Sequence, residues 1–374
     1  MKKSTPAKHI VFVYIGDLRT RARLLKQIET LSAAGVTCEV ILGNTTERPI
    51  TPDEFPFRVR EIPIRLRQGK IKTWRQVVQF NRKATARIVD SPADAACAFS
   101  LTTLPSCTAA NKRRSLFVVY DSNELHVENT PGFPQHQLTR LKQWMHARHA
   151  DVIQHAEANR MSHFMQTYGY SRRSESVLIE NFPSYSGPLA HKSAEAKFIY
   201  LGGLAPNRHM EEIIDAFVEG GSEFQIDIFG GGSPGYIERL KQRIPANAAN
   251  RVKMPGPVPN SEVLGILERY HAGFAFYRNV NLNSYWCAPN KVFDYLMSGV
   301  AVITNDYPGL RKVVEANHVG CCLSEVSKAT ILEAIRQMRE ERPWERIDDY
   351  LRRKYSWDAQ ISTLLSIYGI PADA

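Results

Sequence analysis

The chain has 374 residues, of which 43% are hydrophobic and 23% are charged. A single hydrophobic core stops growing at about 250–300 residues, so the length predicts two domains. The ordinary composition excludes a disordered, collagen-like or low-complexity protein. The longest apolar run near the N-terminus, Ile10 to Ile15, is too short for a membrane-spanning helix or a cleavable signal peptide, so we expect a cytoplasmic protein.

The net charge of +10 is concentrated in the first half of the chain. Residues 1–190 hold 27 Lys and Arg against 16 Asp and Glu, whereas residues 191–374 hold 21 against 22. The excess is greatest where Arg58, Arg60, Arg65, Arg67, Lys70, Lys72, Arg75, Arg82, Lys83 and Arg87 accompany the single acid Glu61. This asymmetry indicates an anionic partner: nucleic acid, anionic lipid or a phosphorylated acceptor. The alternative is a solvated loop and helix face.

In chain order, the first half begins with an apolar strand, His9 to Ile15, and a Gly-Asp turn. Apolar residues at helical spacing predict a helix from Arg21 to Ala34, with Gly35 as its C′ residue and a strand from Thr37 to Leu42 after it. Strand, helix and strand at this spacing predict a parallel sheet. The further expected elements are strands Cys97–Thr102 and Ser115–Tyr120, helix Gln137–Ala150, strand Asp151–His155, helix Asn159–Tyr168 and strand Val177–Glu180.

A stretch rich in Pro, Ser and Gly follows and predicts a linker near residues 184–196. The strand–helix alternation then restarts. The expected elements are strand Lys197–Leu201, helix Met210–Val218, strand Gln225–Phe229, helix Pro234–Ile244, strand Val252–Met254, helix Ser261–Tyr270, strand Ala272–Tyr277, helix Lys291–Ser298 and strand Val300–Thr304. Two doubly wound α/β domains in tandem are predicted, with ligands beyond the carboxyl ends of the strands.

Two glycine turns follow predicted strands of the second half. In the first, Gly202 and Gly203 precede Arg208, which lies just before a helix. Glycine lets a ligand approach the backbone, and an arginine there is suited to clamp a diphosphate. An ordinary turn with a surface arginine explains the pattern equally well. The second turn, Gly230-Gly231-Gly232, permits close contact with a nucleotide but is a weak signal alone.

The most specific pattern is the run from Ala288 to Ile303. Pro289 suits the start of a helix, and Asp294 falls on its second turn. Asp has poor helix propensity, so a partner such as a ribose is expected there. Lys291 lies three residues earlier on the same face, where it could meet donor phosphates. A surface Lys–Asp pair is the alternative interpretation.

The order and spacing of these segments resemble the retaining glycosyltransferase family 4. The resemblance rests on Gly202–Phe217, Phe229–Gly232, Val252–Phe276 and Pro289–Ile303, and more loosely on Tyr120–Leu125, Ala150-Asp151, Ile179–Pro183 and Tyr355-Ser356-Trp357. It implies the GT-B architecture: two Rossmann-like doubly wound domains facing each other across a cleft, with a C-terminal helix returning to the N-terminal domain. The implied divisions are an acceptor-binding domain (1–185), a nucleotide-sugar-binding domain (186–350) and a returning segment (351–374).

The resemblance also implies the residues of the site. Arg208 matches the basic residue on the donor diphosphate, and Asp294 matches the second acid of the Glu-x7-Glu motif, which holds the ribose. With Lys291, these are the expected catalytic residues. The expected substrate-binding residues are Gly16, Asp17, Asn123, Gly202, Gly203, Gly230, Gly231, Gly232, Pro289 and Asn290.

The sequence departs from the family pattern at three positions. Trp286 stands where the first acid of the motif falls, although the variant of the motif with Pro-Asn-Lys often lacks that acid. Gly203 stands where many members have a second arginine, and Asn123 where a histidine is often found.

The expected function is retaining, metal-independent transfer of a hexose from a UDP- or GDP-sugar to a glycan or lipid-linked glycan, in envelope polysaccharide synthesis. No separate cofactor or metal is expected. The basic first domain, with Trp74 and Phe80 among its arginines, would lie on the inner, anionic face of a membrane. Nucleic acid is a less favoured partner. The alternatives are a degenerate GT-B protein that only binds polysaccharide or nucleic acid, a GT-B sugar-nucleotide epimerase, and a dinucleotide-dependent oxidoreductase, for which no GxGxxG is present.

Overall fold

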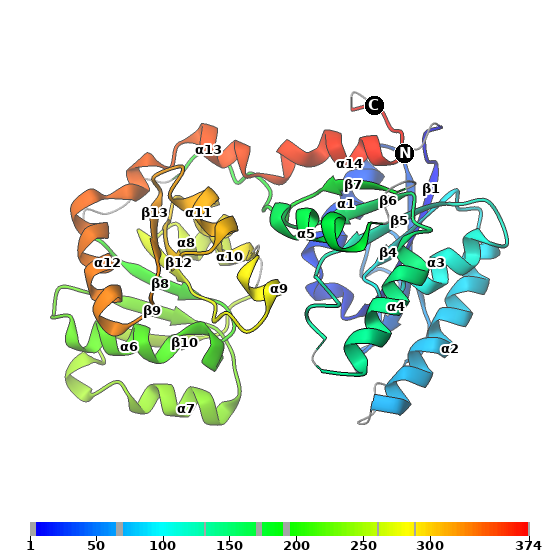
Figure 1. The fold of residues 1–374 in the computed structure, drawn as a ribbon. Coiled ribbons are helices and arrows are strands. Elements are labelled where there is room, and N and C mark those ends of the chain that lie inside the picture. Colours follow the sequence, from blue (N-terminus) through cyan, green and yellow to red (C-terminus); the bar gives the residue numbers. More distant parts are fainter. Residues whose placement is uncertain are drawn as a thin grey trace. The chain divides into compact units, whose positions relative to one another are not determined.

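The chain forms two compact units (Figure 1). The computed structural model describes residues 5–64, 70–130, 132–169, 174–189, 195–259, 262–287 and 289–372. Unit 1 contains Met1–Glu180 and Gln360–Ala374, and unit 2 contains Asn181–Ala359. No helix among the described residues is both long enough and apolar enough to span a membrane.

Unit 1 is built on a seven-stranded sheet in the order β3-β2-β1-β4-β5-β6-β7. All neighbouring strands are parallel. The strands are β1 (His9–Gly16), β2 (Thr37–Asn44), β3 (Arg58–Glu61), β4 (Ala95–Phe99), β5 (Phe117–Ser122), β6 (Val152–His155) and β7 (Glu175–Leu178). The central strands are continuous apolar runs because helices cover both faces of a parallel sheet.

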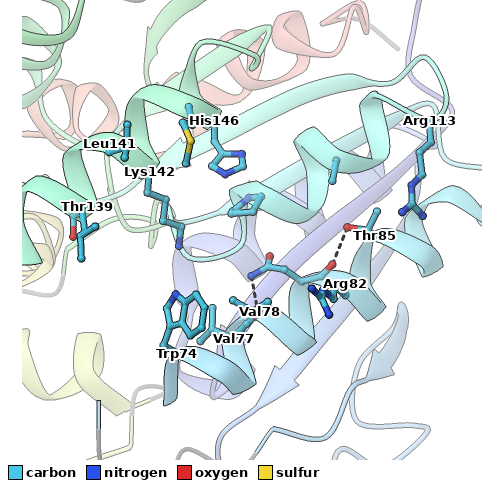
Figure 2. A pocket seen from close by; sticks show the side chains of 15 residues that line it. Trp74, Val77, Val78, Arg82, Thr85, Arg113, Thr139, Leu141, Lys142 and His146 are labelled. Carbon is cyan, nitrogen blue, oxygen red and sulfur yellow. Dashed lines mark hydrogen bonds between the residues drawn. The ribbon is translucent and has the colours of Figure 1, made fainter. Parts of the chain in front are cut away.

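The helices of unit 1 are α1 (Ala22–Ala33), α2 (Lys70–Val89), α3 (Leu104–Asn111), α4 (Gln135–Ala147), α5 (Ala158–Tyr168) and α14 (Ile361–Ile367), with the short turns η1 (Leu18–Thr20) and η6 (Trp357–Gln360). Helix α3 lies between α2 and α4, and α1 packs against α14. Side chains of α2, α3 and α4 line a groove of about 860 Å³ (Figure 2).

Unit 2 has a six-stranded parallel sheet in the order β10-β9-β8-β11-β12-β13. Its strands are β8 (Phe198–Leu201), β9 (Ile226–Phe229), β10 (Val252–Gly256), β11 (Ala272–Ala275), β12 (Ala301–Asn305) and β13 (Gly320–Leu323). Its helices are η2 (Pro206–Arg208), α6 (Met210–Glu219), α7 (Pro234–Gln242), η3 (Ala246–Ala248), α8 (Val263–Leu267), α9 (Leu282–Tyr285), α10 (Asn290–Met297), α11 (Pro308–Val314), α12 (Lys328–Glu341), η5 (Pro343–Arg346) and α13 (Asp349–Lys354). The predicted fold of two Rossmann-like parallel sheets is thus confirmed.

Several predicted elements differ in extent. The strand predicted from Cys97 to Thr102 ends at Phe99, because Ser100 takes a positive φ of 101° and its carbonyl accepts the N–H of Thr103 in a turn. Strands β3 and β13 and helices α2, α3, α9, α11, α12 and α13 were not predicted. Ser261, Ala288, Arg65 and Arg67 lie outside the described residues.

The division between the units differs from the predicted boundaries after residues 185 and 350. Phe182 belongs to unit 2, because its ring centroid lies 4.6 Å from that of Phe293 and 5.6 Å from that of Tyr355. Gln360 belongs to unit 1, where its side-chain amide donates to the carbonyl of Glu180 over 2.9 Å. The return to unit 1 therefore begins at Gln360.

The basic segment of unit 1 is partly structural. Arg60 forms an ion pair of 3.0 Å with the buried Glu39, and Arg87 donates to the carbonyl of Glu61. The expectation that Phe80 is a surface residue is wrong: its side chain is 1% exposed, because it faces the sheet from α2. Trp74, by contrast, is 64% exposed.

Candidate functional site

The candidate site of unit 2 starts at the loop after β8. Gly202 takes a φ of +143°, which L side chains rarely adopt, and its N–H donates to the carbonyl of Phe229 at the end of β9. A Cβ on Gly230 would lie 1.8 Å from the carbonyl oxygen of Gly202. The two glycine loops therefore touch backbone to backbone at the carboxyl edge of the sheet.

Gly231 and Gly232 of the second glycine loop also contact the first loop, at Leu204. The N–H of Leu204 donates to the carbonyl of Gly231 over 2.8 Å, and Leu204 forms a parallel bridge with Gly232. A Cβ on Gly232 would lie 2.4 Å from the carbonyl oxygen of Leu204. These contacts give the three glycines a structural role, and their predicted role in binding substrate stays a prediction.

Arg208 ends the short helix η2, close to the same edge. Its guanidinium carbon lies 4.3 Å from the centre of the Tyr277 ring, within the range of a cation–π contact. Within the described residues, the guanidinium donates a hydrogen bond of 3.4 Å to the adjacent carbonyl of Asn207. Among the residues that the structure describes, no carboxylate forms an ion pair with this guanidinium, so it keeps donors for a ligand.

Lys291 lies on the first turn of α10 and is only 9% exposed, so it is not part of a surface Lys–Asp pair. Its Nζ lies 4.0 Å from the centre of the Tyr200 ring and 5.5 Å from that of Tyr277, and it makes no hydrogen bond with any described residue. A Cβ on Gly202 would lie 3.0 Å from this Nζ. The amine is therefore held against bare backbone and two aromatic rings.

Burial lowers the pKa of Lys291 to about 7, with a further contribution from the positive charge of Arg208. The carboxylate of Asp294 opposes this shift. A buried ammonium without a hydrogen-bond partner is costly, and an arriving anion would remove that cost.

The two tyrosines are themselves fixed. The hydroxyl of Tyr200 donates to the carbonyl of Gly203 over 2.8 Å. The N–H of Tyr277 donates to the side chain of Asn305 over 2.6 Å, and its carbonyl accepts from the hydroxyl of Tyr307. Neither ring was predicted from the sequence to be part of the site.

Helix α10 carries the remaining predicted residues of this site. Pro289 is its N-cap residue, with extended backbone, and Asn290 accepts a hydrogen bond from the side chain of Asn181. Asp294 is half-buried on the second turn. The structure thus brings Gly202, Arg208 and Lys291 together at one edge of the sheet, and the carboxylate of Asp294 is close enough to act on the charge of Lys291. Such an arrangement is suited to a phosphorylated, hydroxyl-bearing ligand.

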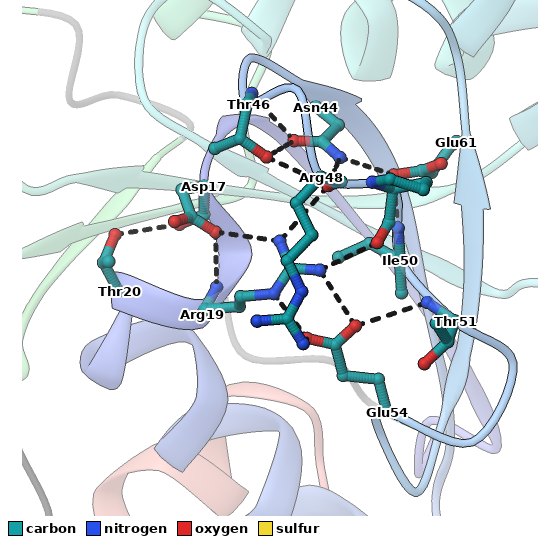
Figure 3. Close-up of polar contacts among 11 residues, drawn as sticks. Asp17, Arg19, Thr20, Asn44, Thr46, Arg48, Ile50, Thr51, Glu54 and Glu61 are labelled. Carbon is teal, nitrogen blue, oxygen red and sulfur yellow. Dashed lines mark hydrogen bonds and ion pairs between the residues drawn. The ribbon is translucent and has the colours of Figure 1, made fainter.

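In unit 1, Gly16 ends β1 and Asp17 caps the following turn. Asp17 accepts the N–H of Arg19 over 3.1 Å and forms an ion pair of 3.6 Å with its guanidinium (Figure 3). Arg19 is also paired with Glu54 and donates to the carbonyl of Pro49 over 2.9 Å. This network ties the β1 loop to the loop after β2, and it leaves Asp17 engaged within the protein.

Asn123 follows β5 at the same edge of the sheet in unit 1. Its carbonyl accepts a hydrogen bond of 3.2 Å from Arg160, whereas its buried side-chain Oδ1 has no hydrogen-bond partner among the residues that the structure describes. A buried amide oxygen without a donor is uncommon, and it marks this position for a ligand that donates a hydrogen bond.

A buried ion pair supports this edge. Asp121 of β5 is fully buried and accepts from Nε of Arg23 over 2.9 Å and from Gln27 over 2.7 Å. Arg23 also donates to the carbonyl of Ile179. Helix α1 is thereby fastened to the ends of two strands.

Part of unit 2 is similar to a known family of proteins. Residues 195–341 match the family model described as "Glycosyl transferases group 1". Curated protein sequences give no significant match.

Solved structures match nearly the whole chain. Sucrose-phosphate synthase from Thermosynechococcus elongatus has a TM-score of 0.76 at 13% identity, covering 96% of this chain and 98% of that chain. HepE of Anabaena in complex with UDP-glucose has a TM-score of 0.68 at 14% identity, covering 96% and 99%. WaaG, a glycosyltransferase involved in lipopolysaccharide biosynthesis, has a TM-score of 0.66 at 11% identity, covering 95% and 99%. These similarities show the GT-B fold.

Proposed function

We propose that this chain, a glycosyltransferase with a group 1 domain at residues 195–341, moves a sugar from a nucleoside-diphosphate donor to a glycan or lipid-linked glycan. The donor is a UDP- or GDP-sugar, transfer retains the anomeric configuration, and neither a metal nor a separate cofactor takes part. The reaction serves the synthesis of envelope polysaccharide at the cytoplasmic face of the membrane.

The main support for this proposal is the pair of cations Arg208 and Lys291. Both contact the Tyr277 ring, and neither forms an ion pair with a described carboxylate. Glycosyl transfer from such a donor leaves negative charge on the departing diphosphate. Preorganised positive groups in a site poor in water stabilise that charge strongly. Arg208 and Lys291 would supply this stabilisation, and Asp294 would accept the ribose hydroxyls.

The solved relatives support the choice of donor and pathway by analogy. One structure of HepE holds UDP-glucose, and WaaG is involved in lipopolysaccharide biosynthesis. At 14% and 11% identity these likenesses establish a fold, so the donor sugar, its base and the acceptor are parts of the proposal.

The acceptor side of the proposal rests on unit 1. Arg75, Arg82 and Lys83 are exposed on α2 beside the exposed Trp74, and each cation near an anionic bilayer contributes about 1 kcal/mol. Gly16, Asp17 and Asn123 follow strands of this unit and would contact the acceptor or the transferred sugar.

A thermal-shift screen over UDP- and GDP-sugars tests the donor site. A ligand at 100 times its Kd stabilises the protein by about 2.7 kcal/mol, so the right donor raises the melting temperature by several degrees. Arg208→Ala and Asp294→Ala should abolish the shift. Lys253→Ala, which removes an exposed charge from β10 of the same unit, is the matched control and should keep it.

The rival functions predict other outcomes. A binding protein without activity, which the tryptophan at position 286 would suit, gives no transfer and no hydrolysis of any bound nucleotide sugar. An epimerase converts the donor sugar without an acceptor. Either result, read by chromatography of the products, contradicts the proposed transfer.

A further inference from the structure

The groove between α2 and α4 in unit 1 combines an apolar lining with positive charge. Trp74 of α2 and Leu138, Leu141 and Met145 of α4 line it and are 64%, 61%, 50% and 41% exposed. Soluble proteins seldom leave large apolar side chains grouped at the surface unless a partner covers them. The volume of about 860 Å³ is large enough for a lipid chain or a drug-sized ligand.

Three cations line the same groove: Arg82, Arg113 and Lys142. Lys142 extends from α4 across the groove toward Trp74 (Figure 2). Its amine makes neither a hydrogen bond nor an ion pair with any described residue, and burial lowers its pKa to about 8. No Asp or Glu is among the described residues that line the groove.

The neighbouring face of α4 continues the apolar surface. Leu138, Leu141 and Met145 recur at helical spacing on one face, and Trp144 beside them is 47% exposed. Arg148 stacks over the Trp144 ring at 4.0 Å. A helix with apolar residues outward and cations at their margin is typical of proteins that lie at a lipid interface.

We propose that this groove binds an anionic lipid, with the lipid chain along Trp74, Leu138 and Leu141 and the phosphate at Lys142. A soluble polar ligand would not cover the leucines, and an apolar ligand without charge would leave the Lys142 ammonium without a counter-ion. A phosphate on an apolar chain satisfies both features at once. The inference extends the proposed action of unit 1 at a membrane, but it needs neither donor nor acceptor.

Calorimetric titration of the full chain with dodecyl phosphate tests the proposal. The dodecyl phosphate is kept below its critical micelle concentration. Two probes separate the parts of the ligand: inorganic phosphate has the charge alone, and dodecyl maltoside has the chain with an uncharged head. We expect dodecyl phosphate to bind at least about tenfold more tightly than either.

Two matched pairs of variants locate the site. Lys142→Gln should weaken binding about tenfold, whereas Lys83→Gln removes an exposed charge of α2 outside the groove and should not. Leu141→Asn should weaken it about fivefold, whereas Met165→Asn, at a similarly exposed position of α5, should not. These side chains are not in the core, so all four variants should melt close to the unmodified protein.

Three results would overturn the proposal. If inorganic phosphate binds as tightly as dodecyl phosphate, the dodecyl group contributes nothing to binding. Equal effects of Lys142→Gln and Lys83→Gln would show unspecific attraction of charge. Dimerisation that Leu141→Asn abolishes would assign the groove to a second copy of the chain. These experiments contain no nucleotide sugar, so a negative result would not contradict the proposed donor site.

Discussion

The Nζ of Lys291 lies 4.0 Å from the centre of the Tyr200 ring, and no described residue accepts a hydrogen bond from it. The centre of the Tyr277 ring lies 5.5 Å from this amine and 4.3 Å from the guanidinium carbon of Arg208. Aromatic faces attract cations without neutralising them as carboxylates would. The two tyrosines can therefore hold both cations in place while leaving their charge available to a diphosphate.

Tyr277→Leu should weaken the binding of the donor nucleotide about fivefold, because the loss of a cation–π contact costs about 1 kcal/mol. Tyr277→Phe keeps the ring and should bind almost as tightly as the unmodified protein. Calorimetric titration with UDP and GDP measures both. Equal losses in the two variants would mean that the hydroxyl, and not the ring, matters.

The pH dependence of donor binding should report the Lys291 amine. Its pKa is lowered to about 7 in the free protein, so the amine is charged below that pH and neutral above it. A diphosphate favours the charged form, so binding above pH 7 takes up a proton, and affinity falls by up to about tenfold per pH unit between pH 7 and 10.

Titrations at pH 8 in buffers of different ionisation enthalpy measure that proton. Lys291→Met should bind more weakly at pH 7 and lose most of the proton uptake. Uptake that is unchanged in Lys291→Met would assign the titration to another group.

Gly202→Ala and Gly203→Ala form a matched pair in one loop. Gly202 has a positive φ, and a Cβ there would lie 3.0 Å from the Lys291 Nζ, whereas a Cβ on Gly203 would meet no atom within 4 Å. Gly202→Ala should therefore weaken nucleotide binding at least about tenfold and lower stability by about 1 kcal/mol. Gly203→Ala should be close to neutral; similar effects on nucleotide binding in both variants would contradict this account of the loop.

Arg23→Met should destabilise unit 1 by about 3 kcal/mol. The substitution leaves the carboxylate of Asp121, which is fully buried, without its charged partner. Scanning calorimetry of the full chain measures the loss, with the exposed Lys83→Met as control. A change no larger than that of the control would show that Gln27 alone satisfies Asp121.

The alternation of strands and helices could be predicted from the sequence because buried parallel strands are short apolar runs. Gly35 was also predicted correctly: it follows α1 with a φ of +79°. Helix α2 was not predicted, although its sequence has a regular helical pattern. Phe80, Ala84 and Ile88 recur every four residues and are all buried. Strand β3 has a single apolar residue, Val59, and gave no such signal.

The candidate site was predictable only in part. Arg208, Lys291 and Asp294 stand in motifs that can be recognised locally. Tyr200 and Tyr277, however, look like ordinary strand residues, and they meet at Lys291 only because β8 and β11 are neighbours in the sheet. The burial of Lys291, which separates it from a surface ion pair, likewise depends on tertiary packing.

A crystal structure of the chain with a bound UDP- or GDP-sugar would show where the donor diphosphate binds. We expect diphosphate oxygens within hydrogen-bond distance of Arg208 and Lys291, and ribose hydroxyls that face Asp294. A diphosphate bound away from these three side chains would contradict this expectation.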